Sequence, residues 1–175
     1  NMIVHKGKTI FIGDTSVHEY PSSEQMADMA ISTARVVRLF GFDPKVAFVS
    51  HSTFGQPLTS RTKHIKRAVD ILKDKNVDFE FDGDMQPDVA LNPEYEELYP
   101  FAKIVGKANI LIMPGQHSAA ISYKLMKTIG DTKVIGPLLI GLGLPIEIAP
   151  LRTSTSELIN LASIAAYSAE KIDYS

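Results

Sequence analysis

Two loops rich in hydroxyl groups follow apolar runs, and they are the first candidates for a binding site. One holds Ser50, Ser52, Thr53 and Gly55, directly after the apolar run 46–49. Small residues with free backbone amides can cradle an anion, and the helix start behind them adds positive potential. Serine and threonine are also ordinary turn formers and helix caps. This loop alone favours that simpler interpretation.

The second loop follows residues 110–113, an unbroken apolar run that predicts a strand buried on both faces. Pro114 ends that strand because it has no amide hydrogen to donate. His117 and Ser118 come next, and Ser118 is a candidate N-cap for the following helix. Ligands of open α/β sheets bind at the carboxyl ends of strands. Gln116, His117 and Ser118 are therefore predicted to lie beside a ligand.

The elements that position these loops follow from apolar periodicity and turn residues. Strands are expected at 9–12, 46–49, 110–113 and 146–148, with a half-buried or edge strand at 79–81, and helices at 22–40, 60–75, 118–129 and from 155 onward. Ile121, Leu125 and Ile129 recur at helical spacing. The alternation of strands and helices predicts an α/β domain with three layers, in which a mostly parallel sheet is flanked by helices.

Composition narrows the class of protein. The chain has 175 residues, 22% charged residues and a formal net charge of −2, which fits one globular domain and no nucleic-acid partner. No cysteine is present, so disulfide and thiolate chemistry are excluded. No apolar run has the length of a membrane span, and residues 1–20 lack a secretory pattern. A cytoplasmic protein without a membrane partner is expected.

Motifs for common cofactors are absent from the sequence. There is no GxGxxG and no Walker loop. The five histidines lack the spacing of metal ligands, and Asp82, Asp84 and Asp88 match no calcium loop. We expect no metal site; Asp82 and Asp84 are interpreted as a strand end. The apolar run 138–142, interrupted upstream by Gly136-Pro137, is expected to lie in the core or at a subunit interface.

Five motifs in this order resemble those of the phosphate acetyl/butyryltransferases: D-x-x-V at 14–17, S-x-S-x-x-G at 50–55, F-x-F-D-G at 79–83, N-I-L-I-M-P at 109–114 and I-G-P-L-L-I-G-L at 135–142. The chain resembles most the phosphotransacetylase-like C-terminal region of bacterial NADP-dependent malic enzymes, because of the segments 88–94, 98–101 and 117–118. The resemblance implies one half of the isocitrate/isopropylmalate dehydrogenase-like phosphotransacetylase fold. It also implies that residues 1–175 are a single domain of a longer chain, with 151–175 as a returning C-terminal helix.

The chain departs from this family at positions that matter for catalysis. The family has a Ser-Arg pair before the last helix and an aspartate in its first turn, and both the serine and the aspartate serve the attack of the coenzyme A thiol. Here Leu151-Arg152 and Leu158 occupy these positions, and Ala120 stands where the family has an asparagine. Leucine can neither accept a proton nor hydrogen-bond a thiol. Arg152 remains available to a phosphate, and no residue is assigned a catalytic role.

The resemblance therefore implies a regulatory and oligomerisation domain that senses acetyl-CoA and lacks transacetylase activity. The parent enzyme would oxidise malate to pyruvate and CO2 with NADP and a divalent cation, both bound outside this domain. A homodimer or higher homo-oligomer is expected. The alternative is a transferase that moves an acyl group between acyl phosphate and coenzyme A. A purely structural dimerisation domain is a third possibility. The expected ligand residues are Ser50, Ser52, Thr53, Gly55, Pro114, His117, Ser118 and Arg152.

Overall fold

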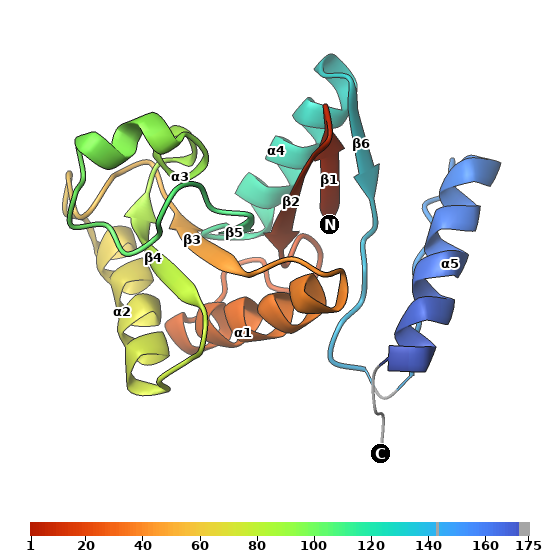
Figure 1. The fold of residues 1–175 in the computed structure, drawn as a ribbon, viewed down its shortest axis with the longest axis horizontal. Helices are drawn as coiled ribbons and strands as arrows, with labels where there is room; N and C mark the ends of the chain where they lie inside the picture. Colours follow the sequence, from red (N-terminus) through yellow and green to blue (C-terminus); the bar gives the residue numbers. More distant parts are fainter. Residues whose placement is uncertain (143, 172–175) are drawn as a thin grey trace.

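A six-stranded sheet with the order β4-β3-β5-β2-β1-β6 forms the centre of the fold (Figure 1). The computed structural model describes residues 1–142 and 144–171. The strands are β1 (Met2–His5), β2 (Lys8–Gly13), β3 (Lys45–Val49), β4 (Glu80–Met85), β5 (Ile110–Ile112) and β6 (Thr132–Ile135). The helices are α1 (Ser23–Leu39), α2 (Ser60–Asp74), α3 (Pro87–Leu91), the 3-10 helix η1 (Pro93–Glu97), α4 (Gln116–Ile129) and α5 (Thr155–Lys171).

Most of the sheet is parallel, as predicted. The pairs β2–β5, β5–β3 and β3–β4 are parallel, whereas β1 pairs antiparallel with both β2 and β6. The strands expected at 9–12, 46–49 and 110–113 are confirmed, and β4 lies at the edge of the sheet. β1 and β6 were not expected, because their four-residue sequences carry no clear period-2 pattern.

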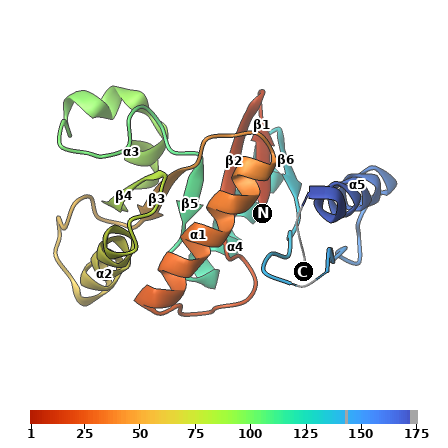
Figure 2. The same ribbon diagram turned by 60° about the horizontal axis from the view of Figure 1, so that its bottom comes forward.

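Helices cover both faces of the sheet, which confirms the three layers (Figure 2). α1 and α2 pack on one face together with Val46, Phe48, Ile110 and Ile112. α3 and α4 contribute to the other face, where the alternate residues Ala47, Val49 and Leu111 point. Because successive residues of a strand face opposite sides, the unbroken apolar runs of β3 and β5 supply both cores.

Local signals place α1 against the end of β2. Ser22 caps α1 in a capping box with Gln25, at the start of the helix predicted at 22–40. A β-carbon at Gly13 would lie 2.7 Å from Ile112 Cδ1 and 3.2 Å from Thr33 Oγ1. A larger residue would force Ile112 and Thr33 to shift, so Gly13 eases the approach of α1 to the carboxyl end of β2.

Two expectations for the C-terminal half are wrong, namely the N-cap at Ser118 and the strand at 146–148. α4 begins at Gln116, and the Ser118 hydroxyl donates to the Gly115 carbonyl (2.8 Å) instead of capping backbone amides. Ile121, Leu125 and Ile129 of α4 are exposed by 58%, 53% and 83%, so this stripe faces outward. Residues 146–148 form no strand, since Glu147 makes only an isolated bridge with Leu138. Periodicity identifies an apolar face but not the surface that covers it.

Helix α5 lies at the edge of the molecule beside β6, remote from α2 and α3 (Figure 1). Glu157 in its first turn pairs with Lys127 at 3.0 Å, and the Tyr167 hydroxyl donates to the Leu39 carbonyl at 3.1 Å. Leu161 is its buried residue. Among the described helices, none has the length and apolar character needed to cross a membrane.

Candidate functional site

The loop after β3 is held together from within by Asp84, a residue that sequence reasoning treated only as a strand end. The Asp84 carboxylate accepts hydrogen bonds from the Ser52 hydroxyl and, at 3.0 Å, from the Gly55 amide. Asp84 is 3% exposed and Ser52 is completely buried. A buried carboxylate requires such donors. The only signal in the sequence was an acidic residue next to the glycine of F-x-F-D-G.

The other hydroxyl groups of this loop also face inward. The Gln86 amide donates to Thr53 Oγ1 (3.2 Å), and Ser50 Oγ lies 3.2 Å from Ser52 Oγ. Ser50 and Thr53 are buried. These interactions correspond to the simpler interpretation of the loop, in which serine and threonine stabilise a turn. Of the ligand residues predicted in this loop, Gly55 is half-buried, whereas the three hydroxyl residues are buried.

The loop after β5 meets the long loop that follows β2. The Gln116 amide donates to the Glu19 carbonyl at 3.2 Å, and a ring nitrogen of His117 lies 3.1 Å from the Glu19 carboxylate. The His117 ring stacks on Tyr20 with the centroids 6.0 Å apart. The His117 side chain is 68% exposed, so of the predicted residues in this loop it is the one most open to solvent.

Arg152 does not join these loops. Its segment leads into α5, whose Glu157 is tied to Lys127 in the last turn of α4. His117 is in the first turn of α4, about 15 Å from Lys127 along the helix axis. Arg152 therefore lies toward the opposite end of α4. In the described chain, the predicted ligand residues at 50–55, 114–118 and 152 therefore do not all lie together.

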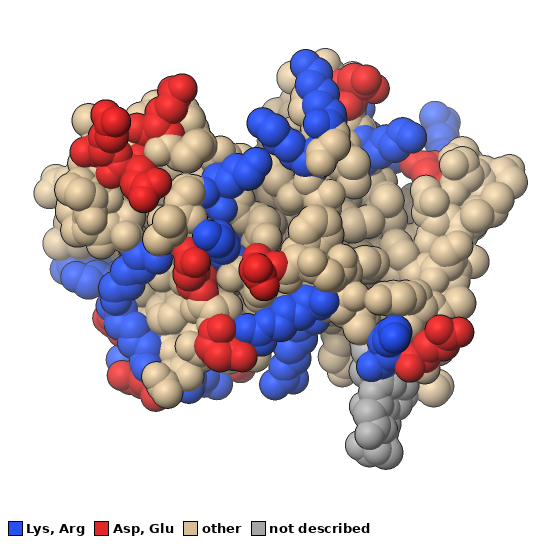
Figure 3. Space-filling model, in the orientation of Figure 1, with Lys and Arg blue, Asp and Glu red and all other residues tan. Residues whose placement is uncertain are grey.

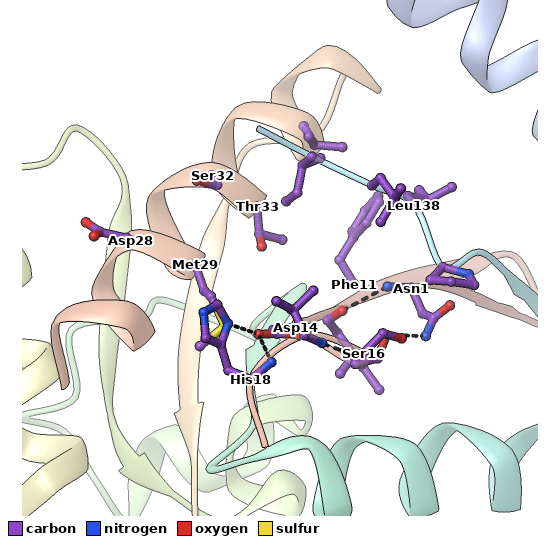
Figure 4. A pocket seen from close by; sticks show the side chains of 18 of the residues that line it. Asn1, Phe11, Asp14, Ser16, His18, Asp28, Met29, Ser32, Thr33 and Leu138 are labelled. Atoms are coloured by element: carbon purple, nitrogen blue, oxygen red, sulfur yellow. Dashed lines mark hydrogen bonds and ion pairs between the residues drawn. The ribbon is translucent and has the colours of Figure 1, made fainter. Parts of the chain in front are cut away.

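A cavity of about 400 Å3 opens at the carboxyl end of β2, where sequence reasoning placed no ligand residue (Figure 4). Asp14, Ser16 and His18 line one side, and Met29, Ser32 and Thr33 of α1 line the other. Residues 137–140 form a further wall. Cavities of this size commonly hold small molecules. The loops predicted from sequence do not contribute to its lining.

Asp14 organises the loop beside the cavity. Its carboxylate accepts hydrogen bonds from the backbone amides of Ser16 (3.2 Å), Val17 (2.8 Å) and His18 (3.0 Å), and it pairs with the His18 ring. Burial acts to raise the pKa of the Asp14 carboxyl, but these hydrogen bonds outweigh it and hold the pKa below its ordinary value. Asp14 thus remains ionised and orients the His18 ring at the cavity mouth.

A second groove of about 230 Å3 continues from this cavity past residues 138–140 toward α5. Ser32, Val36 and residues 138–140 line both spaces. Glu147 also lines the second groove, and its Oε2 atom is buried without a hydrogen-bond partner in the described chain. Burial raises the pKa of Glu147 to about 7.

Comparison with known proteins assigns the family. The family model described as phosphate acetyl/butaryl transferase matches residues 1–166. The chain belongs to this family. Its relatives include the NADP-dependent malic enzyme of Rhizobium meliloti, which is 46% identical over 164 residues, or 94% of this chain and 22% of that enzyme. The phosphate acetyltransferase of Clostridium acetobutylicum is 33% identical over 93% of this chain and 49% of its own length.

Solved structures of the same family have the same fold. A phosphotransacetylase from Streptococcus pyogenes superposes with a TM-score of 0.91 at 28% identity, covering 98% of this chain and 53% of that protein. The chain therefore spans about half the length of the transacetylases and about a fifth of the malic enzymes it matches. The resemblance deduced from the five sequence motifs is confirmed.

Proposed function

We propose that this chain is the phosphotransacetylase-like regulatory and oligomerisation domain of an NADP-dependent malic enzyme, and that its ligand is acetyl-CoA. The observation that carries this proposal is the 46% identity to a malic enzyme over nearly the whole chain, against 33% to a free transacetylase. NADP, the divalent cation and malate would bind to the part of such an enzyme that this chain does not match.

The same proposal holds that the domain has no transacetylase activity. Leu151 is fully exposed and Leu158 is 47% exposed, and neither can serve a thiol. The first turn of α5 does contain a carboxylate, Glu157. Hydrogen bonds from Ser154 and Lys127 hold the pKa of Glu157 at about 2, so this carboxylate is a weak base. The alternative function, acyl transfer between acyl phosphate and coenzyme A, lacks its reacting groups.

The expected lack of transacetylase activity is tested by an assay of acetyl-CoA formation from acetyl phosphate and coenzyme A. We expect no turnover above the rate without protein, whereas enzymes typically turn over about 1–1,000 times per second. A double variant, Leu151→Ser with Leu158→Asp, restores the residue types that the family uses and serves as a comparison. Turnover by the wild-type chain in the enzymatic range would contradict the proposal.

An oligomerising role is supported by apolar surface on the C-terminal half. Ile121, Leu125 and Ile129 of α4 are exposed, as are Leu158 and Ile159 of α5. The region around α5 carries few charged side chains on the face seen in Figure 3. Exposed apolar patches commonly mark interfaces, and a twofold dimer is the simplest closed assembly. Sedimentation at micromolar concentration tests this role, and only monomer would count against it.

Acetyl-CoA binding is tested by calorimetric titration into the 175-residue chain. The wild type should bind. Arg152→Ala examines the predicted phosphate contact, since losing a charge-assisted hydrogen bond weakens binding by about tenfold or more. Arg67→Ala is the matched control, because Arg67 is exposed on α2 and outside the predicted site. Absence of heat and of thermal stabilisation at millimolar acetyl-CoA would contradict the sensing role and leave a structural dimerisation domain.

A further inference from the structure

Two of the sequence motifs shared with the family line the same cavity, although neither supplied a predicted site residue. D-x-x-V at 14–17 forms one wall, and residues 137–140 of I-G-P-L-L-I-G-L form another. They are brought together by the antiparallel pairing of β1 with both β2 and β6, since β2 leads into the first motif and β6 into the second. The two motifs thus line different parts of a cavity that is large enough for a small ligand.

The charges of the lining residues decide which ligands fit. The cavity side chains include the carboxylates of Asp14 and Asp28 but no lysine or arginine, and all the lining residues belong to the described chain. The Asp28 carboxylate forms an ion pair with Lys75 Nζ at 3.0 Å, and its side chain is largely exposed to solvent. An ionised Asp14 disfavours phosphate by charge repulsion. The cavity therefore suits a neutral ligand.

The shape and polarity of the cavity further restrict the chemical class of the ligand. Apolar side chains of Phe11, Met29, Val36 and residues 138–140 form much of the wall. Ser16, His18 and Ser32 place hydrogen-bonding groups around them. The space then continues past residues 138–140 into the second groove, where Arg35 and Glu147 add charged groups to an otherwise largely apolar lining. An extended chain of methylene groups interrupted by amides and ending in a small acyl group matches this mixed, elongated lining.

We infer that this cavity holds the neutral acyl-pantetheine arm of an acyl-CoA ligand, while the charged nucleotide end lies outside it. The inference rests on the proposed acetyl-CoA sensing and adds the place and the part of the ligand that is recognised. His18, oriented by Asp14, and Ser32 would hydrogen-bond the amide or thioester groups. The apolar wall would bury the methylene groups away from water.

Met29 provides a direct probe, because it is the one of the six methionines that lines the cavity. The chain is labelled with 13C at the methionine methyl groups, and the Met29 signal is assigned with Met29→Leu. Acetyl-CoA and S-acetyl-N-acetylcysteamine, which carries only the end of the arm, should both shift the Met29 signal. Adenosine 3′,5′-bisphosphate, which lacks the arm, should leave it in place.

A cavity-filling variant tests the same inference by affinity. Ser32→Leu places a larger apolar side chain in the cavity wall and should weaken acetyl-CoA binding at least tenfold. Leucine is the better helix former, so α1 should remain folded, as its thermal unfolding will verify. Ser163→Leu is the matched control, because Ser163 is exposed on α5 and lines neither space. That variant should bind acetyl-CoA as the wild type does.

The possible results separate the two proposals. If calorimetry shows acetyl-CoA binding but the Met29 signal does not move, the cavity is not the site, and the sensing function still stands. Unchanged affinity in Ser32→Leu leads to the same conclusion. If neither heat nor any methyl shift is detected at millimolar acetyl-CoA, the sensing function fails and the inference falls with it. Shifts of Met29 with both thioesters support both proposals.

Discussion

Helices α1 and α5 have the same length, 17 residues, and both have an apolar stripe, yet the fold uses them differently. α1 buries seven residues, among them Met26, Ala30 and Val37, which are completely inaccessible. α5 buries Leu161 and leaves Leu158 and Ile159 exposed. Most of the stabilisation of a protein helix comes from the surface that covers its apolar face. α1 has that surface within this chain, whereas α5 has little of it.

The same contrast extends to polar groups. Asp84, near the end of β4, is buried and receives hydrogen bonds from Ser52 and Gly55. Glu147, in the segment before α5, has a buried carboxylate oxygen without a partner in the described residues. The Asp84 carboxylate is thus satisfied by its neighbours, whereas this oxygen of Glu147 has no described donor. The C-terminal half thus combines exposed apolar side chains with a buried acceptor that no described residue satisfies.

The largest expected effect is a difference in the loss of stability between a variant in α1 and a variant in α5. Met26→Ala should lower the free energy of unfolding by about 2–5 kcal/mol, because it removes a completely buried side chain and leaves a cavity. Ile159→Ala on α5 should change it by less than about 0.5 kcal/mol, because Ile159 is 60% exposed. Urea unfolding of both variants measures the difference. Equal losses would mean that α5 is as firmly packed as α1.

The second prediction concerns the buried carboxylate of the sheet half. Asp84→Ala leaves the Ser52 hydroxyl and the Gly55 amide without their acceptor, so the free energy of unfolding should fall by about 1.5–3 kcal/mol. Asp88→Ala is the control, because Asp88 is exposed on α3. Urea unfolding measures both. A loss no larger in Asp84→Ala than in the control would show that the loop after β3 does not depend on this carboxylate.

The third prediction tests whether the exposed apolar stripe of the C-terminal half is an interface. Ile121→Glu with Leu125→Glu should weaken self-association at least tenfold, because the charges would be buried in the interface. The unfolding of the monomer should hardly change, since both side chains are already more than half exposed. Sedimentation over a range of concentrations measures the first effect. Unaltered association would place the interface elsewhere, for instance on α5.

The smallest effect is a pH dependence that Glu147 contributes. Burial raises the pKa of Glu147 from 4.5 to about 7, so the folded state holds its proton more tightly than the unfolded state does. This contribution to stability is present below about pH 4.5 and is lost as the pH rises toward 7. Glu147→Gln should remove this loss. The stability of the variant relative to wild type should therefore increase between pH 5 and 8.

Urea unfolding of wild type and Glu147→Gln at several pH values measures this difference. The comparison of variants is needed because burial also lowers the pKa of the Asn1 amine to about 6, and that group contributes a trend of opposite sign. Glu170→Gln is the control, because Glu170 is exposed on α5. A pH-independent difference between Glu147→Gln and wild type would mean that Glu147 titrates normally.

Much of the fold could be predicted from the sequence, and the outcome for individual elements shows why. The runs at 46–49 and 110–113 are continuous enough to demand burial on both faces, so β3 and β5 were found. The helix predicted at 22–40 is α1, which runs between the N-cap Ser22 and the C-cap Phe40. β1 and β6 were missed because their four-residue sequences show no clear alternation, and β6 is held by pairing with β1, which is distant in the sequence. Ser118 failed as a cap because a glycine already starts α4.

The sequence by itself determined the α/β class, the positions of the central strands and, through its motifs, the family. Only the tertiary structure decided which polar residues are open to a ligand. Ser52 has the residue type of a binding group, but its hydroxyl donates to the Asp84 carboxylate. No local sequence pattern links these two residues. The cavity joins residues 14–18, one face of α1 and residues 137–140. These segments are far apart in the sequence, and a cavity is a property of their packing that no single segment encodes.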